Sequence, residues 1–154
     1  METQQAEAAI RPLTSDDIDA VVAACDWLFE PPASVPEQWD PAAARERLLQ
    51  LTTATRSRAL VAEFDATIVG FCTVYLDIDS LRFGQRAWLN ELAVHPAYRS
   101  RGIGRRLLHA GRQWARSNGA TMLMLDSSNV RMDAHRFYRR AEPSVEARCF
   151  GWRL

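Results

Sequence analysis

The sequence predicts one α/β domain, residues 1–154, in which a mixed and mostly antiparallel sheet carries helices on both faces. The spacing of apolar residues is helical up to residue 51, alternates from Arg58, and becomes helical again after residue 102. The strand–helix–strand unit over 87–126 places its two strands side by side in parallel, whereas the hairpins before it are antiparallel. Composition agrees, because 47% hydrophobic and 25% charged residues are average for a globular domain.

The first part of the chain reads as one strand followed by two helices. We expect a strand over 9–13 and a helix from Thr14-Ser15 to Leu28, with hydroxyl caps and acidic residues in its first turn. The stretch 30–40 holds three prolines and is expected to be a loop. Asp40-Pro41 then gives the cap and the first residue of a second helix.

The middle of the chain predicts a meander of three strands. Alternation over 59–64 and 67–78 indicates two strands joined by a short turn, Asp65-Ala66. The polar stretch 79–85 is expected to be a loop before a third strand over 87–94.

The last part predicts a helix, a strand, a helix and a final strand. The first helix ends at Asn118-Gly119, and its apolar face is made of Ile103, Leu107, Leu108, Gly111 and Trp114. We expect a short buried strand over 120–126, a helix over 133–140 and a terminal strand over 146–154. That strand is a candidate exposed edge, which favours a homodimer.

Charge and composition exclude several classes of protein. The 19 basic and 19 acidic residues cancel, so binding to nucleic acid through bulk positive charge is not expected. No run approaches the ~18 apolar residues that span a bilayer, and the N-terminus lacks an export signal, so we expect a cytoplasmic protein without a membrane segment. We expect Cys25, Cys72 and Cys149 to be reduced core thiols, and no spacing of ligands predicts a metal site.

The segment Glu91–Arg106 (ELAVHPAYRSRGIGRR) carries the strongest signal for a ligand. A buried strand runs into a turn with glycines at the start of a helix, which leaves backbone N–H groups unpaired at the positive end of the helix dipole. Arginines around the turn add charge, although they also suit a solvated helix start. The spacing fits neither a P-loop nor the dinucleotide fingerprint. We interpret the turn as a pyrophosphate site.

Two motifs resemble those of the GCN5-related N-acetyltransferase (GNAT) superfamily. ELAVHPAYRSRGIGRRLL is similar to the acetyl-CoA-binding motif, and the segment 133–138 (DAHRFY) resembles the second motif, especially that of aminoalkylphosphonate and other small-amine acetyltransferases. The order of elements matches over nearly the whole chain. The resemblance implies a GNAT-like fold, whose sheet is splayed at the strand that holds acetyl-CoA.

The resemblance also implies roles for single residues. Tyr138 occupies the position of the general acid, although it also suits a buried tyrosine, and Glu91 is the expected general base or, equally, a substrate anchor. The backbone of the splayed strand would pair with the pantetheine arm of the cofactor. The expected cofactor-binding residues are Leu92, Ala93, Val94, Arg99, Ser100, Arg101, Gly102, Ile103, Gly104, Arg105 and Asn129.

The sequence departs from the family pattern at two places. Arg131 stands where many members carry an asparagine that contacts the cofactor, and we expect Asn129 to substitute for it. Ala141-Glu142-Pro143 replaces the usual Gly-Phe after the tyrosine, so the end of the last helix must differ.

Together these features predict an acetyl-CoA-dependent N-acetyltransferase that acts on a primary amine of a small molecule by direct attack in a ternary complex. A loop that mixes aromatic residues and carboxylates, 25–40, suits a cationic acceptor. The alternatives are a non-catalytic acetyl-CoA-binding module, or an enzyme acting on a protein N-terminus or on aminoacyl-tRNA.

Overall fold

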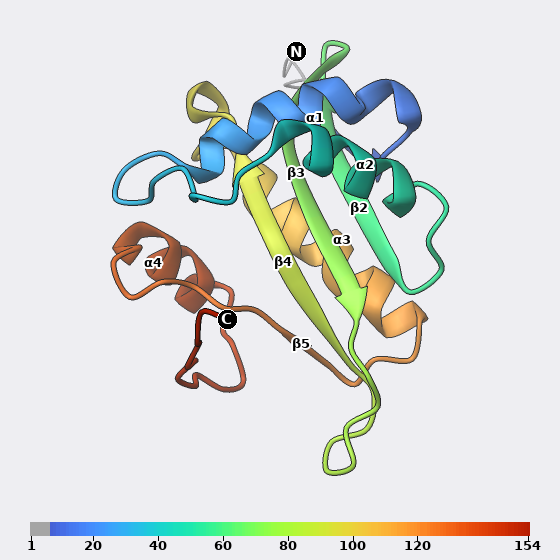
Figure 1. Cartoon of the computed structure of the whole chain (residues 1–154), viewed down its shortest axis with the longest axis vertical. Helices are drawn as coiled ribbons and strands as arrows, with labels where there is room; N and C mark the ends of the chain where they lie inside the picture. The colour runs from blue at the N-terminus through green and yellow to red at the C-terminus, as the bar shows by residue number, and fades with distance from the viewer. Residues whose placement is uncertain (1–6) are drawn as a thin grey trace, which may run out of the picture.

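A computed structural model describes residues 7–154 and confirms the mixed sheet (Figure 1). The remaining six residues, which hold part of the stretch expected to lack an export signal, lie outside the described residues. The sheet has five strands in the order β1-β2-β3-β4-β5. The first three pairs of neighbours are antiparallel, and β4 and β5 are parallel, as the strand–helix–strand unit predicts.

The elements follow the predicted order up to the last helix. The strands are β1 (Ala9–Pro12), β2 (Ser57–Phe64), β3 (Thr67–Leu76), β4 (Arg86–Val94) and β5 (Met122–Met124). The α-helices are α1 (Ile18–Ala24), α2 (Pro41–Leu51), α3 (Ile103–Ser117) and α4 (Met132–Arg140). Short 3-10 helices, η1 (Ser15–Asp17), η2 (Cys25–Leu28) and η3 (Pro96–Tyr98), extend α1 at both ends and follow β4.

Local sequence signals place most boundaries. Asp65 and Ala66 both have positive φ, 47° and 57°, which is the geometry of a tight two-residue hairpin turn. The Asp40 carboxylate accepts a hydrogen bond of 2.9 Å from the Ala42 N–H and caps α2. Gly119, with φ of 87°, follows the end of α3.

The two faces of the sheet are covered by different helices. Helices α1 and α2 lie across one face, and α3 runs along the other (Figure 1). Each interface has its own apolar cluster: Val21, Val61, Phe71 and Ala93 belong to the first, and Cys72, Leu89, Ile103 and Leu107 to the second. Because β3 and β4 contribute to both clusters, their central residues are held from two sides.

The predicted terminal strand over 146–154 is wrong. This segment has no regular structure, and its residues are exposed. Glu142 has a φ of 53° and turns the chain after α4, and the guanidinium of Arg139 holds Glu146 at 2.9 Å, so the segment does not align with the three-residue strand β5. Alternation alone cannot make a strand without a neighbour.

Three smaller expectations are also corrected. Cys149 is exposed because it lies in this unpaired segment, whereas Cys25 and Cys72 are buried as predicted. Strand β5 spans three residues rather than 120–126 and is only partly buried. On α3 the buried face includes Ala115, while Trp114 stays half-buried.

Candidate active site

The edge of β4 that faces β5 opens after Trp88. The parallel pairing aligns only Arg86–Trp88 with Met122–Met124. On the other edge, the His95 N–H donates to the Val69 carbonyl at 2.9 Å, and antiparallel pairs alternate between bonded and non-bonded positions. The backbone groups of Leu92 and Val94 therefore face the open edge, as the splayed strand of the resemblance requires.

The backbone groups of Ala93 point toward β3 rather than toward the open edge. It is aligned with Phe71 of β3, and its carbonyl oxygen lies 3.1 Å from the place where a Cβ on Gly70 would stand. Its side chain is buried in the cluster beneath α1. Of the three residues expected to pair with a pantetheine arm, only Leu92 and Val94 thus turn backbone groups to the gap.

A bulge in β4 directs the side chain of Glu91. The register with β3 pairs Thr73 with Glu91 but Val74 with Leu89, so Asn90 is an extra residue. An extra residue shifts the alternation of side chains by one. Leu89 therefore packs beneath α3, whereas Glu91 lies on the face covered by α1 and η2, together with Thr73.

The carboxylate of Glu91 is half-buried and held by two side chains. It accepts hydrogen bonds from the Thr73 hydroxyl and, at 2.8 Å, from the Asn90 amide nitrogen. The Glu91 N–H in turn donates to the Thr73 hydroxyl oxygen at 3.2 Å. Burial raises the pKa of Glu91 above its usual value, and the two hydrogen bonds oppose this rise. A carboxyl with a raised pKa is a better proton acceptor than an exposed one.

The turn between β4 and α3 presents a row of backbone N–H groups. Ser100 and Gly102 have positive φ of 62° and 78°, and the first hydrogen bond of α3 runs from the Arg106 N–H to the Gly102 carbonyl at 3.1 Å. Among the described residues we find no acceptor for the N–H groups that precede it, those of Ser100, Arg101, Gly102, Ile103, Gly104 and Arg105. Such a row at the positive end of a 15-residue helix suits the oxygens of a pyrophosphate.

The arginine side chains of this turn have different surroundings. Arg99 donates to the Val94 carbonyl at 3.1 Å and forms an ion pair of 2.7 Å with Glu30. The guanidinium of Arg101 lies 5.1 Å from the centre of the Tyr98 ring. Arg105 is exposed. The charge expected around the turn is present, and one of its arginines also ties the turn to the loop after η2.

Helix α4 packs against the start of α3 at a glycine. A Cβ on Gly104 would stand 3.4 Å from two ring carbons of Phe137 and 3.6 Å from the Val94 side chain. A larger side chain there would displace Phe137. The next residue of α4, Tyr138, packs edge-on against Phe137, with ring centres 5.1 Å apart.

Tyr138 is half-buried within the cluster beneath α3. Burial raises the pKa of its phenol, the guanidinium of Arg131 lowers it, and the Cys72 thiol raises it. The structure shows no hydrogen bond between Tyr138 and Glu91 within the described residues. The two candidate catalytic groups come from different elements, Tyr138 from α4 and Glu91 from β4.

The two residues near the start of α4 differ from what the family pattern suggests. Asn129 is exposed in the connection between β5 and α4. Arg131, which takes the place of the usual asparagine, donates to the Leu28 carbonyl at 2.6 Å. It therefore joins α4 to the end of η2, a contact that local sequence patterns do not reveal.

Carboxylates gather near Tyr75, which lies on the same face of the sheet as Glu91. The Asp77 carboxylate accepts a hydrogen bond of 2.9 Å from the Trp88 indole. Burial and the carboxylates of Asp77, Asp126 and Glu91 raise the pKa of the Tyr75 phenol. Asp126 follows β5 and joins this group of carboxylates through the fold, not through a local sequence signal.

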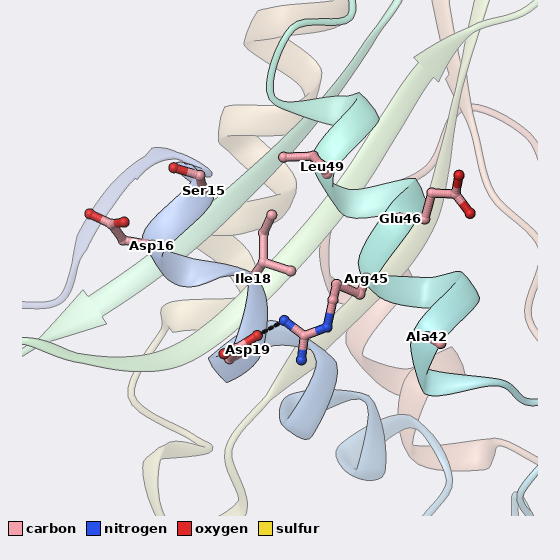
Figure 2. Close-up of a pocket in the computed structure, with 8 residues that line it drawn as sticks. All are labelled: Ser15, Asp16, Ile18, Asp19, Ala42, Arg45, Glu46 and Leu49. Carbon is pink, nitrogen blue, oxygen red and sulfur yellow. Dashed lines mark hydrogen bonds and ion pairs between the residues drawn. The ribbon is translucent and has the colours of Figure 1, made fainter.

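One cavity lies away from the candidate active site, and a second lies next to the turn after β4. A groove of about 630 Å³ separates η1 and α1 from α2, and the ion pair between Arg45 and Asp19 crosses it (Figure 2). A second cavity of about 240 Å³ lies between the loop after η2 and the start of α4. Its lining includes Trp27, Glu30, Arg99 and Arg131.

In residues 7–154 no group of three or more metal-ligating side chains gathers, and no helix is long and apolar enough to cross a membrane.

Comparison with known proteins finds a matching family model and relatives named N-acetyltransferases. The sequence model of the Acetyltransferase (GNAT) family matches residues 22–141. An uncharacterized N-acetyltransferase of Bacillus subtilis, YhdJ, is 32% identical over 90 residues, which cover 58% of this chain and 63% of that protein. Streptothricin acetyltransferase of Streptomyces lavendulae is 35% identical over 85 residues, 54% of this chain and 43% of that protein. The chain thus aligns with less than two thirds of the length of either relative.

Solved structures show the same fold at low sequence identity. An aminoglycoside N-acetyltransferase, AAC(6')-Iy, in complex with CoA superimposes with a TM-score of 0.84 at 15% identity, covering 100% of this chain and 99% of that one. A transcriptional regulator from Bacillus halodurans C-125 gives a TM-score of 0.82 at 22% identity, covering 96% and 99%.

Proposed function

Because the chain belongs to the acetyltransferase (GNAT) family, we propose that it transfers the acetyl group of acetyl-CoA to a primary amine of a small, cationic molecule. The observation that carries this proposal is the row of unpaired N–H groups over Ser100–Arg105, which lies directly after the open edge of β4. Both features fit the same extended ligand, a pyrophosphate joined to an arm that can pair with a strand.

The cofactor would lie along residues that the structure brings together. The amides of Ser100–Arg105 would hold the pyrophosphate, with Arg101 and Arg105 beside them, and the backbone of Leu92 and Val94 would pair with the pantetheine arm. Ala93, Arg99 and Asn129 would contribute less, because their polar groups face β3, Glu30 and solvent respectively. Acetyl-CoA supplies a thioester, whose carbonyl carbon accepts the amine.

The residues of the chain would manage charge and protons. An amine with a pKa near 10 is mostly protonated at neutral pH. Glu91 would take its proton, directly or through a water, and its raised pKa favours that role. A backbone N–H at the open edge of β4 would stabilise the charge that develops on the carbonyl oxygen. Tyr138 would donate its proton to the departing sulfur.

Several carboxylates favour a cationic acceptor. Asp77, Asp126 and Glu91 each raise the pKa of the Tyr75 phenol, so this side chain lies in negatively charged surroundings. Two curated relatives are streptothricin acetyltransferases, and several structural neighbours are aminoglycoside acetyltransferases. These acceptors belong to those proteins, but their polycationic chemistry matches the carboxylates found here.

An enzyme that acts on aminoacyl-tRNA is less well supported. Two of the arginines on α4 have their charge paired, Arg136 with Asp133 and Arg139 with Glu146. The formal net charge of the whole chain is zero. A charged RNA would therefore gain little from this surface.

We also propose a homodimer, through the exposed C-terminal segment. Phe150, Trp152 and Leu154 are 73%, 81% and 121% exposed, and the outer edge of β5 has no partner within the described residues. A second copy could cover both. Light scattering should give a molar mass of two chains for the intact protein. Removal of residues 146–154 should lower it to the mass of a single chain. A single-chain mass for the intact protein at ~100 µM would contradict the dimer.

The proposed activity is tested by measuring free thiol released from acetyl-CoA with a streptothricin, an aminoglycoside, a polyamine and a dipeptide as acceptors. We expect turnover with the polycationic amines, and a loss of roughly 100-fold or more in kcat for Glu91→Gln. Glu46→Gln, which removes an exposed carboxylate on α2, is the matched control and should keep full activity. Folded wild-type protein that releases no thiol with any amine would contradict the proposal.

A further inference from the structure

The sheet face that carries Glu91 is covered by helices over only part of its length. Helices α1 and α2 cross this face where β3 begins and β4 ends, and Phe71 and Ala93 pack there in the cluster beneath α1 (Figure 1). No helix of the described chain lies over the other part of this face, next to the β3–β4 hairpin (Figure 1). The side chains of that part therefore have no helix as their partner.

Two aromatic residues, Tyr75 and Trp88, form a cross-strand pair in this uncovered part. The register aligns Tyr75 of β3 with Trp88 of β4, and Trp88 is aligned in turn with Met124 of β5. Their chain neighbours Val74 and Ala87 pack beneath α3, and successive strand residues point to opposite faces, so both rings point away from α3. Among the described residues neither ring belongs to an apolar cluster, and Tyr75 is 37% exposed.

The aromatic pair lies one step along the strands from the candidate base. Thr73, whose hydroxyl donates to the Glu91 carboxylate, precedes Tyr75 by two residues and lies on the same face. Two residues of a strand span about 7 Å. A molecule whose amine meets Glu91 can therefore place a second group against the aromatic pair when its two groups are about 7 Å apart.

The charge around the pair favours a cation. The Trp88 indole N–H donates to the Asp77 carboxylate at 2.9 Å, which fixes the ring, and the Arg86 guanidinium lies 3.9 Å from the same carboxylate. Glu91 is held by two uncharged side chains and forms no ion pair within the described residues. Nearby carboxylates raise the pKa of the Tyr75 phenol, and no guanidinium of the described chain opposes this rise. Negative surroundings and an aromatic ring face both attract an ammonium group.

Building on the proposed function, we propose that Tyr75 and Trp88 form a subsite for a second ammonium group of the acceptor, about 7 Å from the amine that is acetylated. The acceptor is then a diamine or polyamine whose reacting nitrogen lies at Glu91 and whose neighbouring cation lies against the aromatic pair. Tyr75, the exposed member, determines specificity, and Asp77 positions the Trp88 ring. The subsite takes no part in the transfer of the acetyl group and sets only which amine reaches Glu91.

A merely structural role for Tyr75 predicts a different pattern. In that case the ring would only support the pairing of β3 with β4, and its loss would affect all amines alike. Tyr75→Leu removes the aromatic face, and Tyr75→Phe keeps it. Phe83→Leu removes another exposed ring, in the connection between β3 and β4, and serves as the matched control.

The first measurement is calorimetric binding of amines to the complex of the protein with CoA, which needs no turnover. 1,5-Diaminopentane and pentylamine share one carbon chain and differ by the second ammonium group. We expect wild type, Tyr75→Phe and Phe83→Leu to bind the diamine about tenfold more tightly than the monoamine. In Tyr75→Leu this preference should fall to about twofold, the statistical factor for two equivalent amines. Equal affinities for the two amines in wild type, or an undiminished preference in Tyr75→Leu, would overturn the proposal.

The second measurement is kcat and KM for acetyl transfer to diamines with three, five and eight methylene groups. We expect the lowest KM with five, because the extended length of that diamine matches the span from Glu91 to the aromatic pair. Tyr75→Leu should raise this KM about fivefold or more, while kcat and the KM of pentylamine stay unchanged.

The outcomes separate the subsite from the proposed function. A fall in kcat with all amines alike would assign Tyr75 a structural role and contradict the subsite. If amines are acetylated with no preference for a second ammonium group, the proposed function stands and the subsite fails. If no amine is acetylated but the binding preference depends on Tyr75, the proposed function fails and the subsite stands.

Discussion

Replacing Thr73 with valine tests how much its two hydrogen bonds to Glu91 contribute to the stability of the protein and to the pKa of Glu91. The Thr73 side chain is buried, and its hydroxyl both donates to the Glu91 carboxylate and accepts from the Glu91 N–H. A hydrogen bond to a charged group contributes about 1.5–3 kcal/mol, and a buried donor left unpaired costs about 1 kcal/mol or more. We therefore expect Thr73→Val to lose about 3 kcal/mol of unfolding free energy near pH 8.

The loss should depend on the charge of Glu91. Because burial raises the folded pKa of Glu91 above its unfolded value, the folded protein binds more protons between the two values. The stability of wild type therefore decreases as pH rises through that interval. Thr73→Val removes a group that favours the charged form, so the decrease becomes steeper and the acidic limb of the rate profile moves to higher pH.

Urea unfolding of four proteins measures this coupling. Wild type, Thr73→Val, Glu91→Gln and the double variant form a cycle, and we expect an interaction of about 1–2 kcal/mol near pH 8 that shrinks near pH 5. Thr67→Val, on the exposed end of the same strand, is the control. If Thr73→Val costs the same in wild type as in the Glu91→Gln background, at both pH values, the reasoning is refuted.

Two further changes test the frame around the site. Gly70→Ala places a Cβ 3.0 Å from Leu107 and 3.1 Å from the Ala93 carbonyl oxygen. Because a backbone atom cannot move aside easily, we expect the free energy of unfolding in urea to fall by about 1–3 kcal/mol. An unchanged urea midpoint would be inconsistent with this packing. The Arg11 guanidinium holds the pKa of Asp17 well below its usual range, so Asp17→Asn should cost about 2–3 kcal/mol at neutral pH. This cost should shrink only when pH falls below the ordinary pKa of an aspartate, because the folded carboxylate keeps its charge to lower pH; a cost that is the same at all pH values would argue against the ion pair.

The turn after β4 could be predicted because its signals are local. Glycine at 102 supplies the positive φ that begins α3, and the apolar spacing that follows defines the helix within a few residues. The hairpin turn at Asp65-Ala66 and the cap at Asp40 are local in the same sense. Hence the order of elements up to α4, the mixed sheet and the position of the turn follow from the sequence.

Features that depend on distant partners could not be predicted. The bulge at Asn90 depends on how β4 aligns with β3, and nothing in the alternation of 87–94 marks an extra residue. The contact between Arg131 and Leu28 joins residues 103 positions apart. The terminal strand fails for the same reason, because an alternating pattern at 146–154 forms no strand unless a neighbouring edge is aligned with it.

Calorimetric titration with acetyl-CoA tests the central claim most directly. Wild type should bind with a Kd in the micromolar range, and Gly102→Asp, which sets a carboxylate among the amides of the turn, should weaken binding at least tenfold. Gly84→Asp is the matched control, because Gly84 also has a positive φ, 68°, and open space around it, but lies in the β3–β4 hairpin. Retained affinity in Gly102→Asp, or no binding by folded wild type, would contradict the assignment of the turn to the cofactor.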